Sequence, residues 1–400
     1  MSKKEPDKGY SPVDEPEAGP VQNTEGLSPE RAKQIREHLF KKYRVYNGGE
    51  LAEMKIDPQM TLLGADRLLC VGGIGFLVAP TGVGKSSAVR HMACNWAVKK
   101  PAFGIPAMFH LRVLIIQAEN DRGDETEMVR DIWKLFKPSE QAVIRKGVYV
   151  VRVNDVVGPD FIYLLKLFLA EYKPDLVILD PMNSYTGGDP SDPKIITPFL
   201  RNMVIPALEQ FDAGLLMVHH TPKTRNWDTS KWKQHDWAYA ASGSNEISNV
   251  ARFMLVIDPS DKPGLYVFRA AKRGARIGRK NAIGDPDYIR AFRHDRKHGV
   301  MLWTAASEDE LEHVRRLDKE GKLGRKLKYP TPLLLKPLLT SRDEGGLTRQ
   351  QLAEKLKLSG CAISQTTLYE RLDAELAAGT IECDDRNIYT ITMTGLDLFK

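Results

Sequence analysis

The sequence predicts an α/β fold built on a mostly parallel β-sheet, followed by a small C-terminal domain. Two observations favour this fold. Between about residues 60 and 305, short and uniformly apolar runs alternate with helical patterns, which is typical of strands that helices cover on both faces. The last unit, residues 333–400, instead shows helical patterns that lead into a hairpin pattern. We therefore expect one large sheet domain and one small, separate domain.

The N-terminal part of the chain divides into two segments. Residues 1–27 are rich in Pro, Gly and Glu and carry a net negative charge, so we expect a disordered acidic tail. Residues 28–59 form an N-terminal helical segment, because Ser28 is a suitable helix cap and Pro29 suits the first helical position.

The domain from residue 60 to 305 supplies the strands and crossover helices of the predicted sheet. Its apolar runs are short enough for strands, and the amphipathic patterns between them are long enough for helices. The expected strands lie in residues 72–79, 111–119, 147–153, 174–180, 213–220, 251–258 and 265–271, and the expected helices in residues 86–100, 123–136 and 160–172.

Residues 306–332 are highly charged and predict a linker that is partly helical. In residues 333–400 the pattern favours a winged helix, whose third helix would enter the major groove of duplex DNA. Winged helices also bind proteins, and that alternative stays open. The candidate DNA-binding residues of the third helix are Gln365, Thr367 and Arg371.

Composition and charge exclude several classes of protein. The chain of 400 residues is 42% hydrophobic and 28% charged, with a formal net charge of +6, which is typical of a globular protein and too mild to prove a nucleic-acid partner. No apolar run approaches the roughly 18–20 residues that a membrane-spanning helix needs. We therefore expect no membrane partner. The four cysteines are widely spaced, so we expect free thiols in a cytoplasmic protein.

The segment APTGVGKSS, residues 79–87, predicts a phosphate-binding loop, with Ala79 in place of the first glycine. It follows an apolar run and precedes a helical pattern, so its backbone N–H groups can turn toward phosphate oxygens. We expect Lys85 to reach the β- and γ-phosphates of ATP and the Ser86 hydroxyl to ligate Mg²⁺. The nucleotide-binding residues are then Pro80, Thr81, Gly82, Val83, Gly84, Lys85, Ser86 and Ser87.

Polar residues at the ends of three further strands are candidates for the rest of the site. Asp180 ends the run LVILD and would hold Mg²⁺ together with Ser86, although an Asp there could instead cap a turn. Glu119 is the candidate that orients the attacking water. Of the adjacent His219 and His220, only one can face the nucleotide, because successive strand residues point to opposite faces.

The order of the motifs APTGVGKSS, IIQAEN, LVILDP, VHHT, SGSNEISNVAR and AKRGARIG resembles the RecA-like ATPase core of hexameric replicative helicases. It is more similar still to plasmid RepA-type helicases and related mobile-element ATPases of AAA type. The resemblance implies a RecA-like P-loop NTPase core and a homo-oligomer, expected to be a hexamer. It also implies that Glu119 is catalytic and that His220 senses the γ-phosphate. Arg273 would enter the neighbouring subunit's site, with Lys272 and Arg276 as alternatives.

Two basic regions are candidates for contact with DNA or with a neighbouring subunit. The loop after His220 interleaves cations with tryptophans, as a groove for single-stranded DNA does, although the tryptophans could instead bury apolar area in a lid or subunit contact. Residues 269–297 hold ten Lys/Arg against three Asp/Glu, which fits either the finger region or a solvated basic loop. The candidate residues for single-stranded DNA in a central channel are Lys223, Arg225, Trp227, Lys231, Trp232 and Lys233.

The sequence therefore favours a ring ATPase that acts on DNA, as a replicative helicase of a plasmid, phage or integrated element. Two alternatives stay open. One is an ATP-switched DNA-binding initiator or regulator, and the other is a recombination mediator related to RecA that does not unwind DNA.

Overall fold

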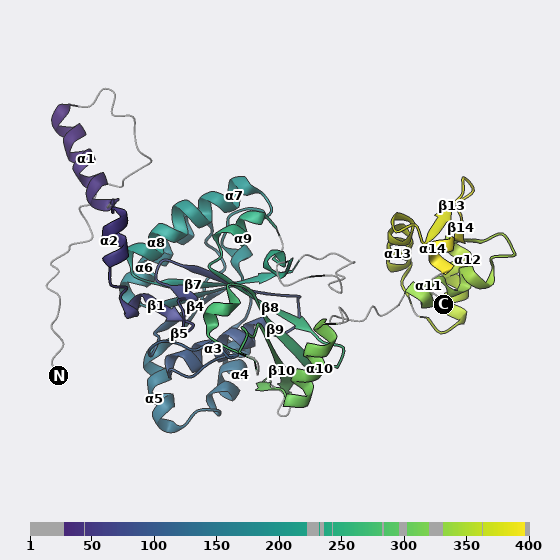
Figure 1. The fold of residues 1–400 in the computed structure, drawn as a ribbon, viewed down its shortest axis with the longest axis horizontal. Helices are drawn as coiled ribbons and strands as arrows, with labels where there is room; N and C mark the ends of the chain where they lie inside the picture. Colours follow the sequence, from purple (N-terminus) through teal and green to yellow (C-terminus); the bar gives the residue numbers. More distant parts are fainter. Residues whose placement is uncertain are drawn as a thin grey trace. The chain divides into compact units, whose positions relative to one another are not determined.

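The computed structural model describes most of the chain as regular structure (Figure 1). The described residues are 28–43, 45–221, 232, 236–241, 243–281, 284–295, 302–319, 331–361 and 363–396. The predicted acidic tail, residues 1–27, lies outside them. The chain divides into two compact units, residues 1–57 and 58–400.

The first unit contains two helices, α1 (Pro29–Lys42) and α2 (Gly48–Glu53). The Ser28 hydroxyl accepts a hydrogen bond from the Arg31 N–H at 3.3 Å and caps α1. The cap therefore satisfies one of the N–H groups that a helix start leaves without a partner. The helix that the sequence predicts in residues 28–59 is present.

The core of the second unit is a nine-stranded sheet with the order β11-β10-β9-β8-β3-β7-β6-β4-β5. The strands from β8 to β5 in this order run parallel, whereas β9, β10 and β11 pair antiparallel. Every expected strand is present, and β10 and β11 are additional. The strands are β3 (Ile74–Ala79), β4 (Val113–Gln117), β5 (Val148–Arg152), β6 (Leu176–Asp180), β7 (Gly214–His220), β8 (Phe253–Pro259), β9 (Leu265–Lys272), β10 (Ile289–Asp295) and β11 (Leu302–Ala305).

Helices cover both faces of the parallel part of this sheet (Figure 1). Alternate residues of β3 explain why the strand is apolar throughout: Phe76 belongs to one buried cluster and Leu77 to the other. On the Leu77 side lie α3 (Lys85–Ala97), α4 (Arg122–Trp133) and α5 (Pro138–Gly147). On the Phe76 side lie α6 (Gly158–Tyr172), α7 (Pro193–Thr197), the π-helical turn η3 (Pro198–Val204), α8 (Ile205–Gln210) and α9 (Asn245–Val250).

A short ribbon and several single turns complete this unit. The strands β1 (Thr61–Leu63) and β2 (Leu69–Cys70) pair antiparallel outside the main sheet. The turns are η1 (Pro58–Met60), η2 (Met182–Ser184), η4 (Asp236–Tyr239) and η5 (Gly274–Ile277).

The segment predicted as a charged linker, residues 306–332, begins with a helix that belongs to the core. Helix α10 (Glu308–Lys319) buries Leu311 and Val314 against apolar residues of β9 and β10. The sequence did not indicate this packing, because the few apolar residues of the helix lie between many charged ones. Of the rest of the predicted linker, residues 320–330 lie outside the described residues, and residues 331 and 332 begin the helix Thr331–Thr340.

Three arginines of the basic stretch 269–297 pair with acidic side chains, and two of these acids lie on α10, which packs beside the strands. Arg269 pairs with Asp318, and Arg293 pairs with Glu310. Arg290 pairs with Asp287 inside the stretch itself. The interpretation of these three arginines as part of a solvated basic loop is therefore wrong, since each has an acidic partner, and two of the partners lie on α10, outside the stretch in which charges were counted.

Residues 331–396 contain the elements that the sequence predicts, in the predicted order. Three helices precede a hairpin, and their apolar residues form one buried cluster that includes Leu335, Leu352, Leu368 and Tyr389. A short strand after the first helix joins the hairpin in a sheet of order β12-β14-β13. The elements are α11 (Thr331–Thr340), β12 (Leu347–Thr348), α12 (Arg349–Leu358), α13 (Gln365–Ala377), β13 (Ile381–Cys383), β14 (Ile388–Ile391) and α14 (Met393–Leu396).

Two general expectations can be compared with the described residues. Within them, no helix combines the length and the apolar character that crossing a bilayer requires. The four cysteines, Cys70, Cys94, Cys361 and Cys383, are free thiols.

We predict that Gly75→Ala destabilises the protein, because a Cβ at this position in β3 would overlap the Phe253 ring on the neighbouring strand. Overpacking of this kind costs about 1–3 kcal/mol of unfolding free energy, which urea unfolding followed by circular dichroism measures. The matched control is Gly147→Ala, whose Cβ would meet its nearest atom at 3.6 Å, an ordinary contact. Equal stability of the two variants would contradict the close packing of β3 on β8.

Candidate functional site

The candidate site lies at the carboxyl edge of the parallel strands. Ala79, the last residue of β3, is level with His220, the last residue of β7. Gln117, the last residue of β4, is likewise level with Asp180, the last residue of β6. Because β7 and β6 are neighbours in the sheet, the phosphate loop, His220 and Asp180 meet at the same edge. The sequence predicted this convergence.

The phosphate loop turns sharply between β3 and α3. Gly82 and Gly84 have φ angles of 82° and 87°, a left-handed conformation that favours glycine. No side chain caps the start of α3 at Lys85, so its first N–H groups are left for a ligand. Within the loop, the Val83 side chain is buried in the core beside α3 and anchors the turn.

Lys85 lies inside the loop rather than in solvent. Its side chain is nearly buried, and the ammonium donates to the carbonyl oxygens of Ala79 and Pro80 at 3.2 and 2.9 Å. Burial lowers the pKa of Lys85, and the charges of Asp180 and Glu119 oppose that effect. The ammonium is thus held at the loop by groups that a phosphate can replace.

The two histidines of β7 divide as their alternation predicts. The His219 side chain is fully buried in the sheet. His220 Nδ1 instead lies 3.1 Å from Lys85 Nζ and 3.3 Å from Thr81 Oγ1. His220 therefore faces the loop, where a γ-phosphate would lie next to the lysine.

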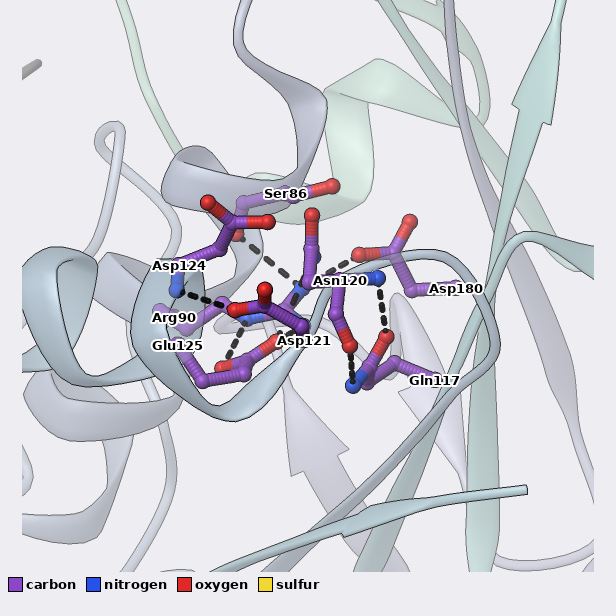
Figure 2. A network of polar contacts seen from close by, with 8 residues as sticks. All are labelled: Ser86, Arg90, Gln117, Asn120, Asp121, Asp124, Glu125 and Asp180. Atoms are coloured by element: carbon purple, nitrogen blue, oxygen red, sulfur yellow. Dashed lines mark hydrogen bonds and ion pairs between the residues drawn. The ribbon is translucent and has the colours of Figure 1, made fainter. Parts of the chain in front are cut away.

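The acid at the end of β6 has a partner that sequence reasoning missed. Asp180 is only 4% exposed, and its carboxylate forms an ion pair with the guanidinium of Arg90 on α3 (Figure 2). Arg90 also pairs with Glu125 near the start of α4. The missed signal was the position of Arg90, a cation five residues after Lys85 in a helix that the predicted fold buries against the sheet.

Glu119 is exposed in the turn that follows β4. The turn is fixed by reciprocal bonds between its neighbours: the Asn120 N–H donates to Gln117 Oε1, and Gln117 Nε2 donates to the Asn120 carbonyl oxygen, both at 2.8 Å (Figure 2). A rigid turn beside Asp180 leaves the Glu119 carboxylate available to solvent and to a ligand.

Side chains of β10 and β11 contact the phosphate loop and support it. The His294 ring packs against Gly84, where a Cβ would overlap it. Trp303 Nε1 donates to Ser87 Oγ at 3.0 Å, and Ser87 Oγ donates to the Gly84 carbonyl oxygen at 2.9 Å. The Ser87 side chain, which we expected at the nucleotide, is therefore engaged in holding the loop.

The three candidates for the finger differ in their contacts. Lys272 Nζ donates to the Ser248 carbonyl oxygen at 2.5 Å, and Arg276 Nη1 donates to the Asp66 carbonyl oxygen at 3.2 Å. Arg273 is exposed. Partial desolvation lowers the pKa of Arg273, and the positive charges of Arg252 and Arg276 act in the same direction. Of the three, Arg273 is best placed to meet an external anion.

Arg273 also lies at the edge of the sheet opposite the loop. Lys272 at the end of β9 is level with Met254 at the start of β8, which in turn is level with Phe76 of β3. The loop begins after Ala79, so Arg273 lies about 15 Å from it along the strands, at about 3.3 Å per residue. This arginine cannot serve its own loop.

The predicted DNA contacts are only partly within the described residues. The half-buried Trp232 packs against the buried Trp237 at 5.0 Å between ring centroids, as the alternative of apolar burial predicts. Gln365 and Thr367 are exposed at the start of α13, whereas Arg371 is mostly buried and pairs with Glu375. Lys223, Arg225, Trp227, Lys231 and Lys233 lie outside the described residues.

These residues fit a nucleoside triphosphate with Mg²⁺. The uncapped start of α3, the left-handed glycines and the enclosed Lys85 form a cradle for phosphate groups. Ser86 and the buried carboxylate of Asp180 are oxygen ligands of the kind that Mg²⁺ uses together with phosphates and water. Elsewhere in the described residues, no group of three or more His, Cys, Asp or Glu could hold a metal ion.

Comparisons with known proteins give one family match and a distant likeness to a solved structure. Residues 53–226 match the AAA domain family, a range that includes the phosphate loop, Glu119, Asp180 and His220. No curated protein matches the chain. Among solved structures, a crystal structure of the RadB recombinase is similar at 12% identity and a TM-score of 0.38, over 57% of this chain and 89% of that chain. The predicted α/β core with a mostly parallel sheet is confirmed by the sheet, and the AAA domain match fits the predicted P-loop NTPase.

We predict that Gly84→Ala weakens nucleotide binding by about tenfold, because the left-handed backbone costs a residue with a Cβ about 1–2 kcal/mol. Its Cβ would also overlap His294. Titration with a fluorescent ATP analogue measures the affinity. The matched control is Gly284→Ala, which has nearly the same φ of 88° but open space around the Cβ, and should leave the affinity unchanged. An equal loss in both variants would show that the loop itself has no special role.

Proposed function

We propose that this protein is an ATP-hydrolysing ring ATPase that acts on DNA, a replicative helicase of RepA type from a plasmid, phage or integrated element. The assembly we propose is a homo-oligomer, a hexamer, in which each nucleotide lies between two subunits. The observation that carries this proposal is the position of Arg273 at the sheet edge opposite its own phosphate loop. An exposed arginine there can reach a triphosphate only on another subunit.

The roles of the site residues follow from their chemistry. Lys85 and the N–H groups of the loop bind the phosphates, and Ser86 with Asp180 holds Mg²⁺, which supplies charge neutralisation at the phosphates when bound. Glu119 orients the attacking water from the turn after β4. His220, which contacts Lys85, reports whether the γ-phosphate is present. Together these groups favour hydrolysis over simple binding.

The DNA-binding part of the proposal rests on two groups of residues outside the nucleotide site. The cations Lys223, Arg225, Lys231 and Lys233 follow β7 directly after His220, so a change at the γ-phosphate can move them along a single strand in a central channel. The exposed start of α13, with Gln365 and Thr367, supports a second contact of the C-terminal domain with duplex DNA.

We predict that Lys85→Ala reduces ATP hydrolysis to background, because the variant loses the ammonium that donates to the loop carbonyls of Ala79 and Pro80. A coupled assay for released phosphate measures hydrolysis, and strand displacement on a forked duplex measures unwinding. Lys166→Ala, an exposed lysine on α6, should leave both rates unchanged. Wild-type hydrolysis by Lys85→Ala would sink the ATPase proposal, whereas hydrolysis without unwinding in the unmodified protein would favour the initiator or recombination mediator.

We predict that Arg273→Ala lowers hydrolysis by about 10³–10⁵-fold, as the loss of an arginine finger does. It should retain nucleotide affinity, because its own loop is intact. Mixing it with Lys85→Ala should restore activity, since some interfaces then pair an intact loop with an intact finger, about a quarter of them with random mixing. Arg276→Ala, which is bound to its own chain, should stay active. No recovery on mixing would exclude action between subunits.

A further inference from the structure

Arg90 is the most completely engaged side chain near the site. It lies on α3, its side chain is 1% exposed, and all three guanidinium nitrogens donate hydrogen bonds. Nη1 donates to the Ser86 carbonyl oxygen at 3.2 Å and to the Asp180 carboxylate, and Nε donates to Glu125 Oε2 at 3.2 Å. Nη2 donates to the other oxygen of Glu125 (Figure 2). The planar fork therefore spans two carboxylates that belong to different elements.

Glu125 extends this contact to the turn that carries Glu119. Its Oε1 accepts a bond from Asn120 Nδ2 at 3.3 Å. Asn120 is in turn fixed to Gln117 at the end of β4, and Gln117 is level with Asp180. A closed path of bonds thus runs from Asp180 through Arg90, Glu125 and Asn120 and returns to the strand next to Asp180.

We propose that Arg90 and Glu125 are positioning residues that hold the metal-binding carboxylate of Asp180 and the turn of Glu119 in one fixed arrangement. This inference rests on the proposed function and deepens it, because it names the residues that set the spacing between the Mg²⁺ ligand and the water-orienting group. Both side chains are engaged with the protein: the buried Arg90 donates to protein oxygens, and Glu125 accepts from Arg90 and Asn120, so we place their action on Asp180 and the turn rather than on a ligand.

The charge of the network supports a role at the metal. Burial opposes the charge of Arg90, but Asp180 and Glu125 outweigh it and raise the pKa of the guanidinium, so it stays charged. The guanidinium then carries one positive charge between two carboxylates, which leaves one net negative charge in this group of three side chains. Groups that orient metal ligands in this way typically change metal affinity about 10–100-fold when they are removed.

A lysine cannot replace this arginine. A single ammonium has the charge but not the planar fork that contacts two carboxylates and a carbonyl oxygen together. A purely structural ion pair would affect unfolding alone, whereas a positioning role also changes how strongly Mg²⁺ improves nucleotide binding. The two roles can therefore be separated by measurement.

The experiment compares Arg90→Met, Arg90→Lys and Glu125→Gln in the full chain with the control Arg130→Met, an exposed arginine on α4. Affinity for a fluorescent ATP analogue is measured with EDTA and over a series of Mg²⁺ concentrations, and kcat and KM are measured by phosphate release. We expect the affinity in EDTA to stay within about threefold, and the Mg²⁺ concentration for half-maximal effect to rise about 10–100-fold.

In the same variants kcat should fall about 10²-fold with a smaller change in KM, because a group is misplaced rather than removed. Arg90→Lys should recover only part of both losses, and Arg130→Met should match the unmodified protein. Unchanged Mg²⁺ dependence in folded Arg90→Met would overturn the inference. Should that variant fail to fold, Glu125→Gln decides in its place, since it keeps the pair of Arg90 with Asp180.

The outcome is distinguishable from failure of the proposed function. If Lys85→Ala hydrolyses ATP normally, the site itself is wrongly assigned. If Lys85→Ala is inactive while Arg90→Met and Glu125→Gln keep normal Mg²⁺ dependence and kcat, only the positioning role is excluded.

Discussion

The ion pair between Asp180 and Arg90 is the interaction on which the rest of the site depends. Parallel strands bring their polar ends to one edge, and at that edge Asp180 is enclosed by the sheet and by α3. A carboxylate this deeply buried is costly unless a cation and hydrogen bonds compensate it. Arg90 supplies that compensation from the helix that begins at the phosphate loop. The same side chain therefore stabilises the acid and ties it to the loop.

The antiparallel strands explain why one sheet can hold both a loop and a finger that do not meet. β9 reverses direction after β8, so its last residue, Lys272, and the following Arg273 lie at the edge opposite the loop. β10 reverses again, which brings His294 back to Gly84. Two reversals thus place Arg273 at one edge and a support for the phosphate loop at the other. The antiparallel strands β9, β10 and β11 therefore contribute directly to the candidate site.

Local patterns in the sequence predicted the strands well because each is buried on both faces, and the loop because its glycines and lysine are contiguous. Partners that are distant in the sequence could not be predicted. Arg90 lies in the mostly buried helix α3, and the residues next to it in the sequence do not show that its partners are Asp180 and Glu125. The arginines of β9 and β10 counted as free charge because their acids lie on α10. Charge counts along a chain measure composition, whereas compensation depends on packing.

Because those arginines are paired, they can be set apart from the cations that stay available to another molecule. Arg269 and Arg293 are neutralised by Asp318 and Glu310, and Lys272 is held by a carbonyl oxygen of α9. Arg273 is left exposed among like charges, which raise the free energy of the isolated subunit at this surface. An anion brought by another molecule relieves that repulsion. In the assembly we propose, the triphosphate of a neighbouring subunit is that anion, and nucleotide binding and subunit assembly then favour each other.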